Sequence, residues 1–493
     1  MSRKRKTGMD GEYMKRALRD APELVIENED ISNAWRLALK NLLEINTVAC
    51  PAQVYNRTGL LDESLGLMMR AGGTYPTPWT RDAAVNTMNA ACFLEPEVAK
   101  NTLWAVCERV HGKLYFQMDD QSWDKIIWAV GAWKYYLATG DREFLEPACE
   151  TVKNSLELLE EIQFNGKYGL FTGGSFFNDG ITGYPADLYQ EGVNSSFVGD
   201  HGSVKDVMTL STNCLYYDAY HILERMEGIL GKREASPGYA KRAEALKEAI
   251  NRFFWREKAG TYSYLLYPDG RRDHSQEGCG ISFAVLTGVC EGEQAKRMIR
   301  GCYRSGRGLV SIWPPFEGIS SEEKPLRHNN LIWPVVNGFF VTAAARCGCA
   351  DIVGEEIRNL ALLAKNDGGS YSEIYSPQTG RPFGGWQCGH VWDSVRDQTW
   401  SATAMIRSLV FGVFGIEPGE ETIAFHPCLP EEFGEPVLKG IRFRGAKMDL
   451  ALRGSGSRVK KLEIRRRGGG EVLSEIPLTK PGEYEVEIQL ENG

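Results

Sequence analysis

The chain has 493 residues, 43% of them hydrophobic and 25% charged, and its 57 basic and 65 acidic side chains give a net charge of −8 at pH 7. This composition is typical of a globular protein with a large core, and the negative charge argues against binding to nucleic acid or anionic lipid. No stretch approaches the roughly 18 consecutive apolar residues of a membrane-spanning helix, so we expect no membrane association. The basic N-terminal tip lacks the apolar run of a secretory signal, and we therefore expect a cytoplasmic protein.

The twelve cysteines are spread along the chain, and several fall inside segments with helical periodicity. A thiol in such a segment acts as a small hydrophobic group, so we expect reduced, packed thiols. Cys347 and Cys349 form the closest pair, but no histidine lies at metal-ligand spacing from either. A structural zinc site requires a tighter cluster, and nucleotide binding requires a glycine-rich loop that is absent here. We therefore expect no metal and no other cofactor.

Helical patterns alternate with glycine- and aromatic-rich loops from about residue 30 to residue 415, because apolar residues recur there at spacings of three and four. Pro96 suits the first turn of its helix, where no backbone donor is needed. In chain order, the predicted helices span residues 31–43, 81–94, 96–110, 122–138, 142–162, 206–230, 236–255, 280–290, 292–303, 330–347, 351–365 and 397–414.

The predicted helices alternate in character along the chain. One set is rich in small, apolar and aromatic residues, and its members contain Asp82, Trp123, Thr212, Phe283, Trp333 and Trp400. Their partners, such as 142–162 and 236–255, are amphipathic, with many Lys and Glu. A helix that is apolar nearly all round is buried, whereas a one-sided helix faces solvent. Six helices of each kind predict an inner and an outer ring, which is an (α/α)6 toroid.

After residue 414 the sequence changes to period-two alternation, as in RVKKLEIRRRG and GEYEVEIQL, separated by Gly, Pro and Asn turns. This pattern predicts a small, compact antiparallel β-domain. We therefore expect a mainly α protein with an N-terminal extension at 1–30, the (α/α)6 barrel at 31–415 and the β-domain at 416–493. The loops before the inner helices are long, and long ordered loops tend to carry function.

Two acidic residues on these loops are surrounded by aromatic rings and glycines. Asp179 lies in YGLFTGGSFFNDGITGYP, whose rings could desolvate a carboxyl group and raise its pKa, although an Asp-Gly turn explains the same sequence. Glu373 lies in GGSYSEIYSPQTGRP, where a solvated loop glutamate is the alternative. Cleavage of a glycosidic bond needs such a pair, one carboxyl group beside the leaving oxygen and a second to activate water or attack directly.

A third cluster, YPTPWTRDAAV, places Trp79, Arg81 and Asp82 at the start of the first inner helix. Asp82 could be a simple helix cap. The cluster also suits a sugar, because a carboxylate accepts hydroxyl protons while an indole packs on the apolar face of the ring. Weaker candidates on the same loops are Asp119, Asp120, Trp123, Asp124, Gln276, Glu277, His328, Asn329, Trp333, His390, Trp392, Asp393 and Trp400. Capping or a structural role explains many of these equally well.

These clusters, in this order, resemble the six-hairpin clan of inverting glucosidases around glycoside hydrolase family 63, which includes debranching α-1,6-glucosidases, trehalases and mannosylglycerate-type hydrolases. WTRDAAV resembles the W-x-R-D segment that holds the non-reducing sugar, and SFFNDGITGYP with VMTLSTNCLYYDAYHIL resembles the loop and helix of the general acid. RHNNLIWPVVNGFF resembles the R-G-P-I-W-x-x-x-N helix. SEIYSPQTGRP with TWSATAMI resembles the loop and helix of the general base, and HPCLPEEF resembles the opening of the β-domain.

The resemblance covers residues 75 to 440 and departs at Phe177, where the family usually shows Trp or Met. It implies a one-step inverting hydrolysis, with Asp179 as the acid and Glu373 as the base, their carboxyl groups about 6.5–9.5 Å apart. Arg81 and Asp82 would orient the sugar, with Trp79, Trp123 and Trp333 as walls. Glu277 is the reserve candidate for the acid.

The resemblance implies an oligosaccharide or small glycoside as substrate, and an exo-acting α-glucosidase is the leading expectation. An α-mannoside or a small glycosyl conjugate is the alternative, and the sequence leaves the oligomeric state open. A disaccharide phosphorylase would share the barrel, but it needs an anion pocket that a carboxylate at Glu373 would oppose. A sugar epimerase or a non-catalytic binding barrel is the remaining alternative. Such epimerases use paired histidines, and the chain has only seven.

Overall fold

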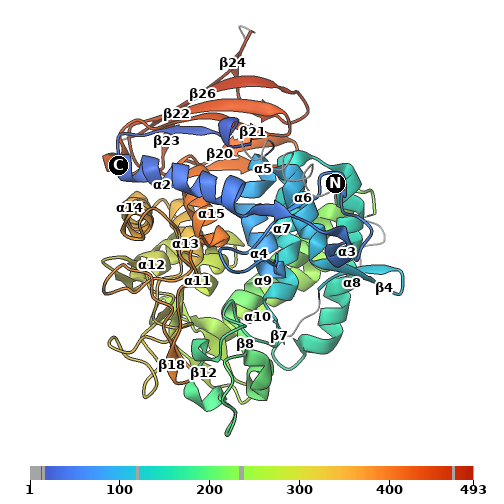
Figure 1. Ribbon diagram of the computed structural model, residues 1–493, viewed down its shortest axis with the longest axis vertical. Coiled ribbons are helices and arrows are strands. Elements are labelled where there is room, and N and C mark those ends of the chain that lie inside the picture. The colour runs from blue at the N-terminus through green and yellow to red at the C-terminus, as the bar shows by residue number, and fades with distance from the viewer. Residues whose placement is uncertain (1–12, 14–16, 118–120, 233–237, 469–471, 492–493) are drawn as a thin grey trace, which may run out of the picture.

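The computed structural model describes residue 13 and residues 17–117, 121–232, 238–468 and 472–491, and it is a mainly α-helical protein (Figure 1). A helix lies in each of the twelve segments predicted from periodicity. These helices are α2 (Glu29–Lys40), α4 (Thr80–Asn86), α6 (Pro96–Ala105), α7 (Asp124–Thr139), α8 (Arg142–Gln163), α9 (Leu210–Ile229), α10 (Tyr239–Phe254), α11 (Gly278–Leu286), α12 (Gly292–Gly301), α13 (Pro334–Arg346), α14 (Ala350–Asn366) and α15 (Thr399–Arg407). None of the helices in the described part of the chain has both the length and the apolarity that crossing a bilayer requires.

Local sequence chemistry sets the helix ends. The chain leaves α7 at Gly140, which adopts the left-handed conformation that glycine tolerates best. Asp141 then caps α8, because its side chain accepts a hydrogen bond from the backbone N–H of Phe144. Three helices continue as π-helical turns: η1 (Asn41–Ile45) after α2, η2 (Thr87–Ala91) and then α5 (Cys92–Leu94) after α4, and η8 (Ser408–Val413) after α15.

The apolar helices pack side by side in chain order. α4 contacts α7, α7 contacts α9, α9 contacts α11, α11 contacts α13 and α13 contacts α15, and α15 contacts α4 again. The succession of contacts therefore closes on itself. The amphipathic helices α2, α6, α8, α10, α12 and α14 pack against the outside of this circuit, and each contacts at least one of its members.

Two glycines allow neighbouring inner helices to approach closely. A Cβ atom on Gly131 of α7 would lie 2.8 Å from the Cα atom of Ala84 in α4. Likewise, a Cβ atom on Gly338 of α13 would lie 2.9 Å from the Cα atom of Ala404 in α15. Any larger residue at either position would push these helices apart.

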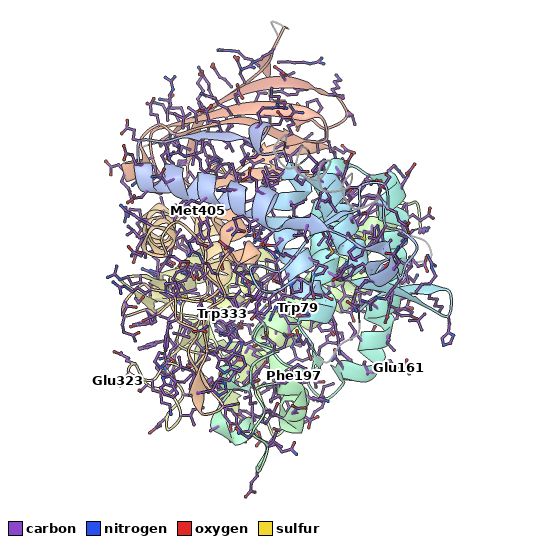
Figure 2. The ribbon with its side chains drawn as sticks, in the orientation of Figure 1. Trp79, Glu161, Phe197, Glu323, Trp333 and Met405 are labelled. Atoms are coloured by element: carbon purple, nitrogen blue, oxygen red, sulfur yellow. The ribbon has the colours of Figure 1, made fainter. Side chains whose placement is uncertain are left out.

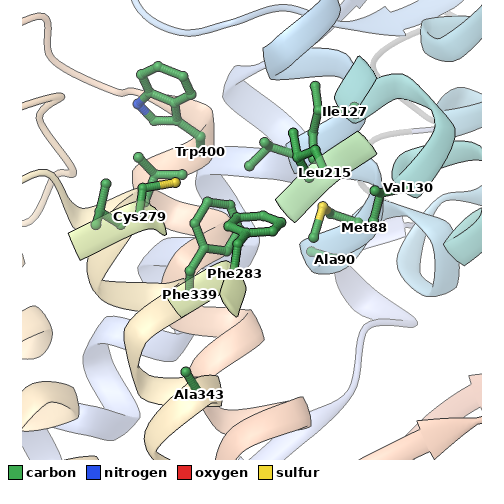
Figure 3. Close-up of a cluster of buried hydrophobic side chains, with 14 of the residues drawn as sticks. Met88, Ala90, Ile127, Val130, Leu215, Cys279, Phe283, Phe339, Ala343 and Trp400 are labelled. Carbon is green, nitrogen blue, oxygen red and sulfur yellow. The ribbon is translucent and has the colours of Figure 1, made fainter. Parts of the chain in front are cut away.

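The centre of the circuit is filled by apolar side chains, several of which are shown in Figure 3. Phe283 of α11 and Phe339 of α13 meet edge to face, with ring centroids 5.0 Å apart. Met88 and Val130 are buried in the same layer. Side chains of this size exclude water from the middle of the circuit, so its two ends are separate environments.

Strands of the C-terminal region form a six-stranded sheet in the order β1-β21-β22-β26-β23-β24, and Figure 1 shows it as a layer at one end of the molecule. Its strands are β1 (Glu23–Val25), β21 (Val437–Phe443), β22 (Ala446–Arg453), β26 (Gly482–Leu490), β23 (Val459–Arg466) and β24 (Val472–Leu473). A three-stranded sheet of β19 (Ile416–Pro418), β20 (Thr422–Phe425) and β25 (Ile476–Pro477) accompanies it.

Two details differ from the sequence-based expectation of an antiparallel sheet formed by residues 416–493 alone. β22 and β26 pair in parallel, because the chain returns through β23 and β24 before β26 enters between β22 and β23. In addition, β1 of the expected N-terminal extension pairs with β21 at the sheet edge. Both pairings join segments that are distant in sequence, so strand alternation alone does not predict them.

Short hairpins occupy the connections between helices. The predicted helix at 96–110 ends early, because its last four residues form β4 and pair with β5 instead. The short strands are β2 (Thr47–Ala49) with β3 (Leu67–Met69), β4 (Cys107–Val110) with β5 (Lys113–Phe116), β6 (Phe164–Asn165) with β7 (Leu170–Phe171), β9 (Trp255–Arg256) with β10 (Thr261–Tyr262), β13 (Gln276–Glu277) with β16 (Ile312–Trp313), β14 (Arg304–Ser305) with β15 (Gly308–Leu309), β17 (Trp386–Gln387) with β18 (His390–Val391), and β11 (Leu265–Leu266) between β8 (Met208–Thr209) and β12 (Arg272–Asp273).

Candidate active site

A pocket of about 120 Å³ lies at the N-terminal ends of the inner helices α4, α7 and α15. Its walls come from these helix ends and from the loops that precede α9, α13 and α15. The lining residues are Tyr75, Trp79, Arg81, Asp82, Gln121, Asp124, Asp179, Arg327, Glu373, Gln398 and Trp400. The two acidic residues singled out in the sequence, nearly two hundred positions apart, therefore line one pocket.

Asp179 is held in the pocket by Arg81, whose Nη2 lies 3.1 Å from Oδ2 and whose Nη1 lies 3.4 Å from Oδ1. The neighbouring Asn178 fixes the loop onto α7, because its Oδ1 accepts hydrogen bonds from the backbone N–H groups of Trp123 and Asp124. This trans-cap satisfies two donors at the start of α7 and sets the position of the next residue, Asp179.

The loop beyond Asp179 needs glycine for a steric reason. A Cβ atom on Gly180 would lie 1.8 Å from Nδ1 of His328, so no other residue fits there without moving the imidazole. His328 is buried, and its Nε2 lies 3.5 Å from Oδ1 of Asp179. Its Nδ1 lies 3.0 Å from Oε1 of Gln387, an acceptor, so the Nδ1 position carries the proton in the neutral ring.

Charges around Asp179 and His328 decide their protonation. Burial raises the pKa of Asp179, but the Arg81 guanidinium outweighs it, helped at acidic pH by the protonated ring of His328, and that pKa lies well below its usual range. Burial lowers the pKa of His328 to about 4, so its ring is neutral near pH 7. In the empty pocket, Asp179 is therefore a carboxylate beside a guanidinium.

Glu373 has the opposite balance. It is buried, its Oε2 accepts a hydrogen bond of 2.7 Å from Nη2 of Arg327, and its backbone N–H donates to the carbonyl of Val395. Burial raises the pKa of Glu373 even though Arg327 opposes it. Arg327 is itself fixed by the carbonyl oxygens of Gly384 and Asp393. Its guanidinium therefore holds one oxygen of Glu373 in a defined place.

Asp82 is a third carboxyl group of the pocket, in the first turn of α4. Burial raises its pKa to about 7, and the nearby charges of Glu373 and Asp179 act in the same direction. A substantial fraction of Asp82 is therefore protonated at neutral pH. In that state its carboxyl group can donate as well as accept a hydrogen bond.

Four buried polar atoms of the pocket-lining residues form no hydrogen bond with the described residues. Nε of Arg81 still lies 3.6 Å from Oδ1 of Asp124, whereas Oδ1 of Asp82, Oε1 of Gln398 and Nε1 of Trp400 have no partner among the described residues. Buried polar groups are nearly always paired with protein or with ordered water, so water or a ligand in the pocket would supply the missing partners. Two acceptors and one donor suit a polyhydroxylated molecule, because each hydroxyl group can both donate and accept.

Aromatic rings complete the pocket. Trp79 is 44% exposed and meets Tyr75 edge to face, with ring centroids 4.9 Å apart. The ring of Trp400 lies 4.9 Å from the Arg81 guanidinium and is almost fully buried. An exposed indole beside a polar pocket offers a flat surface for the apolar face of a sugar ring. Figure 2 labels Trp79 together with Trp333.

The structure does not bring every predicted residue to the pocket lining. Trp123 and Trp333 are fully buried and pack against Phe176 and Phe177, so they support the lining from behind. Asn329 is also buried and donates to the carbonyl of Thr182. Asp119 and Asp120 lie outside the described residues.

Gln276 and Glu277 were predicted to bind sugar but have structural contacts instead. The Gln276 side chain bonds to the backbone of Tyr303 and Val310. Oε2 of Glu277 accepts from the backbone N–H of Gly280 and so caps α11. Both residues belong to β13, which pairs with β16, and neither lines the pocket.

Four lining residues were not singled out in the sequence: Tyr75, Gln121, Arg327 and Gln398. Arg327 is directly followed by His328 and Asn329, which were named instead. The signal that could have identified Arg327 is its positive charge in the motif before the LIWP segment. A buried positive charge needs an acidic partner, and the loop of Glu373 offers one.

A family model described as the mannosylglycerate hydrolase MGH1-like glycoside hydrolase domain matches residues 75–401. Among curated proteins, no sequence matches the chain significantly. Solved structures with a similar fold include a sialidase (14% identity, TM-score 0.64, covering 88% of this chain and 38% of that one) and the GH78 family rhamnosidase of Bacillus sp. GL1 (16%, 0.51, 88% and 42%). A rhamnosidase from Klebsiella oxytoca with rhamnose bound is also similar (13%, 0.50, 80% and 66%). The chain thus spans about two fifths of the length of the first two.

Proposed function

We propose that the chain removes a terminal α-glucosyl residue with inversion, with Asp179 as general acid and Glu373 as general base. The chain belongs to the mannosylglycerate hydrolase MGH1-like glycoside hydrolase family and is a glycoside hydrolase. The observation that carries this proposal is the single pocket that both carboxyl groups line, together with its unpaired hydrogen-bonding atoms. Two carboxyl groups flanking one sugar are the minimum equipment for this reaction.

The proposal includes the architecture that holds the pair. We assign the closed circuit of α4, α7, α9, α11, α13 and α15 as the inner ring of an (α/α)6 barrel, with the amphipathic helices as its outer ring. Residues 31–415 would form this barrel and residues 416–493 a separate β-domain, with β1 from the N-terminal extension as an added edge strand. The barrel axis then runs from the pocket at the N-terminal helix ends to the C-terminal sheet.

For acid catalysis, Asp179 must carry a proton when the glycoside is bound, although Arg81 favours the carboxylate in the empty pocket. A bound sugar displaces water from the pocket, which disfavours the charged form. The leaving oxygen also accepts a hydrogen bond only from the protonated form. His328, neutral with Nε2 facing Oδ1 of Asp179, adds no fixed positive charge that would oppose this protonation.

For base catalysis, Glu373 must remove a proton from water on the opposite face of the sugar. Arg327 engages Oε2, and Oε1 has no hydrogen-bond partner in the described part of the chain. One oxygen is thus held in place and the other is available to water. The raised pKa of Glu373 increases its basicity, which favours proton abstraction once the group is ionised.

The pocket also supports exo action on a small substrate. Its volume of about 120 Å³ suits one sugar ring better than an extended chain. We propose that the substrate is an α-glucoside, and an α-mannoside or a small glycosyl conjugate is the alternative. We also propose that the protein acts in the cytoplasm. Asp82, partly protonated, Gln398 and Trp400 would receive the hydroxyl groups of the terminal sugar.

The test is a screen of aryl α- and β-glycosides of glucose, mannose and rhamnose in phosphate-free buffer, followed by proton NMR of the first product. We expect turnover of an α-glucoside with the β-anomer of glucose appearing first. Immediate release of the α-anomer would overturn the inverting mechanism. Turnover that requires added phosphate would identify a phosphorylase instead.

Arg327 provides a pH-dependent prediction. Replacing it by Gln in Arg327→Gln removes the charge that lowers the pKa of Glu373, so that pKa rises further, by about 1–3 units. Because the base acts only when ionised, the acidic limb of the kcat profile, which reports the substrate complex, should move to higher pH by a similar amount. Arg327→Lys keeps the charge and should leave the limb close to its original position. If the acidic limb stays at its original pH in both variants, Arg327 does not set the pKa of the base.

A further inference from the structure

A second, larger cavity lies at the opposite end of the inner helices, between their C-terminal ends and the C-terminal strands. Its volume is about 760 Å³, within the range of small-molecule sites. Every inner helix, or the π-turn or short helix that continues it, contributes to its wall, and residues of β19, β20, β21 and β23 close it on the other side. This cavity is distinct from the active site, because the apolar layer around Phe283 and Phe339 separates the two ends (Figure 3).

The wall of this cavity carries more basic than acidic side chains, some of them exposed to solvent. Lys134, Arg225, Arg346 and Arg407 face only two acidic residues, Asp218 and Glu417. Arg225 forms a 2.8 Å ion pair with Glu420, and Glu417 lies 3.3 Å from Nε2 of His426. Three cations of the wall form no ion pair with a described residue: Arg346, whose Nη1 donates to the carbonyl of Leu286, and Arg407 and Lys134.

Arg407 is the last residue of α15 and is 8% exposed. It donates from Nε to Oγ1 of Thr342 and from Nη1 to Oδ1 of Asn89, both of which are uncharged. No carboxylate of the described residues lies within ion-pair distance of it. Burying a guanidinium without an anion is costly, and burial lowers its pKa to about 10 accordingly. A bound anion beside Arg407 would offset this cost.

Lys134 of α7 lies on the same wall and is only partly exposed. It forms no hydrogen bond or ion pair with any described residue, and burial lowers its pKa, to which Arg407 and Arg225 contribute by repulsion. Asp218 and Glu417 attract it but lie beyond ion-pair distance. Two cations on one cavity wall, with no carboxylate of the described residues within ion-pair distance of either, form a receptor for an anion.

We propose that this cavity is a second binding site that takes a small anionic metabolite, whose phosphate or carboxylate group is held between Arg407 and Lys134. Nε and Nη1 of Arg407 already donate to Thr342 and Asn89, and Nη2, which has no partner among the described residues, can donate to such a group. The ammonium of Lys134 neutralises its remaining charge. Trp133, Phe411 and Phe443 provide the apolar part of the wall for the body of the ligand. This inference does not depend on which glycoside the active site cleaves.

The test uses inorganic phosphate and citrate as probes with the full-length protein at constant ionic strength, and it measures the melting temperature and the heat of binding. We expect a saturable rise in melting temperature that chloride does not reproduce. Arg407→Gln should weaken the binding of the probe at least tenfold, and Lys134→Gln should weaken it to a lesser extent. Arg300→Gln, which removes an exposed arginine paired with Asp351, is the charge-matched control and should bind as the wild type does.

The site at Arg81 and Arg327 could also attract an anion, so competition with glycoside turnover is measured in parallel. Binding at the second site should persist in the presence of saturating glycoside. Absence of a saturable response in the wild type would overturn the proposal. The proposal would also be overturned if the probes bound equally well to the wild type, Arg407→Gln and Lys134→Gln. Lys134→Gln changes a partly exposed residue, so the test does not depend on Arg407→Gln folding normally.

Discussion

The variant Glu373→Gln should fold normally and lose about three orders of magnitude in kcat, within the range measured for removal of a general base. The amide retains an oxygen that can accept the hydrogen bond from Arg327, so the loop before α15 keeps its anchor. What disappears is the ability to take a proton from water. Because this step is needed for every substrate, the loss should be similar for good and poor leaving groups.

Two additions make this experiment specific to the base. Glu323→Gln changes an exposed glutamate in the loop before α13 and should retain wild-type turnover. Azide needs no general base, so it should restore turnover of an activated aryl glycoside by Glu373→Gln and give the glycosyl azide of inverted configuration. Unchanged hydrolysis in Glu373→Gln would remove this residue from the mechanism and favour a binding function for its carboxylate.

The helices were predictable because their apolar residues recur at helical spacing and because the two kinds of helix differ in composition. The circuit of inner helices then follows from burial, since helices that are apolar all round can satisfy their surfaces only against one another. Periodicity gave a wrong prediction where the same short pattern of apolar residues suits both a helix and a strand. Residues 107–110 continue the apolar spacing of α6 but pair with 113–116, because a hairpin satisfies their backbone groups once α6 has ended at Ala105.

Prediction of the pocket was less complete, for a geometric reason. Motif order identifies which loops converge, and Asp179, Glu373, Arg81 and Asp82 were found in this way. It does not identify which side chain of a loop points inward, so His328 and Asn329 were named while Arg327 beside them was not. The unpaired atoms that most clearly indicate a sugar, those of Gln398 and Trp400, become visible only when every partner in three dimensions is known.

The variant Asp179→Asn should distinguish the general acid from every other role in the pocket. An asparagine oxygen can still accept from Arg81, so the loop geometry set by Asn178 is retained. A methyl glycoside, whose leaving oxygen needs a proton, should be cleaved about 10³ times more slowly, near the middle of the range for acid–base catalysis. A 2,4-dinitrophenyl glycoside leaves without protonation, so its hydrolysis should fall by much less.

The comparison with Glu277→Gln identifies the acid without ambiguity. Burial raises the pKa of Glu277 to about 8, which is the expected property of an acid, but its carboxyl group caps α11 and lies away from the pocket lining. We therefore expect Glu277→Gln to lower the melting temperature while leaving the ratio of the two glycoside rates unchanged. The alkaline limb of the kcat profile reports loss of the proton from the acid in the substrate complex, so it should disappear in Asp179→Asn with the activated glycoside. If the loss of rate depends on the leaving group in Glu277→Gln and not in Asp179→Asn, Glu277 is the general acid instead of Asp179.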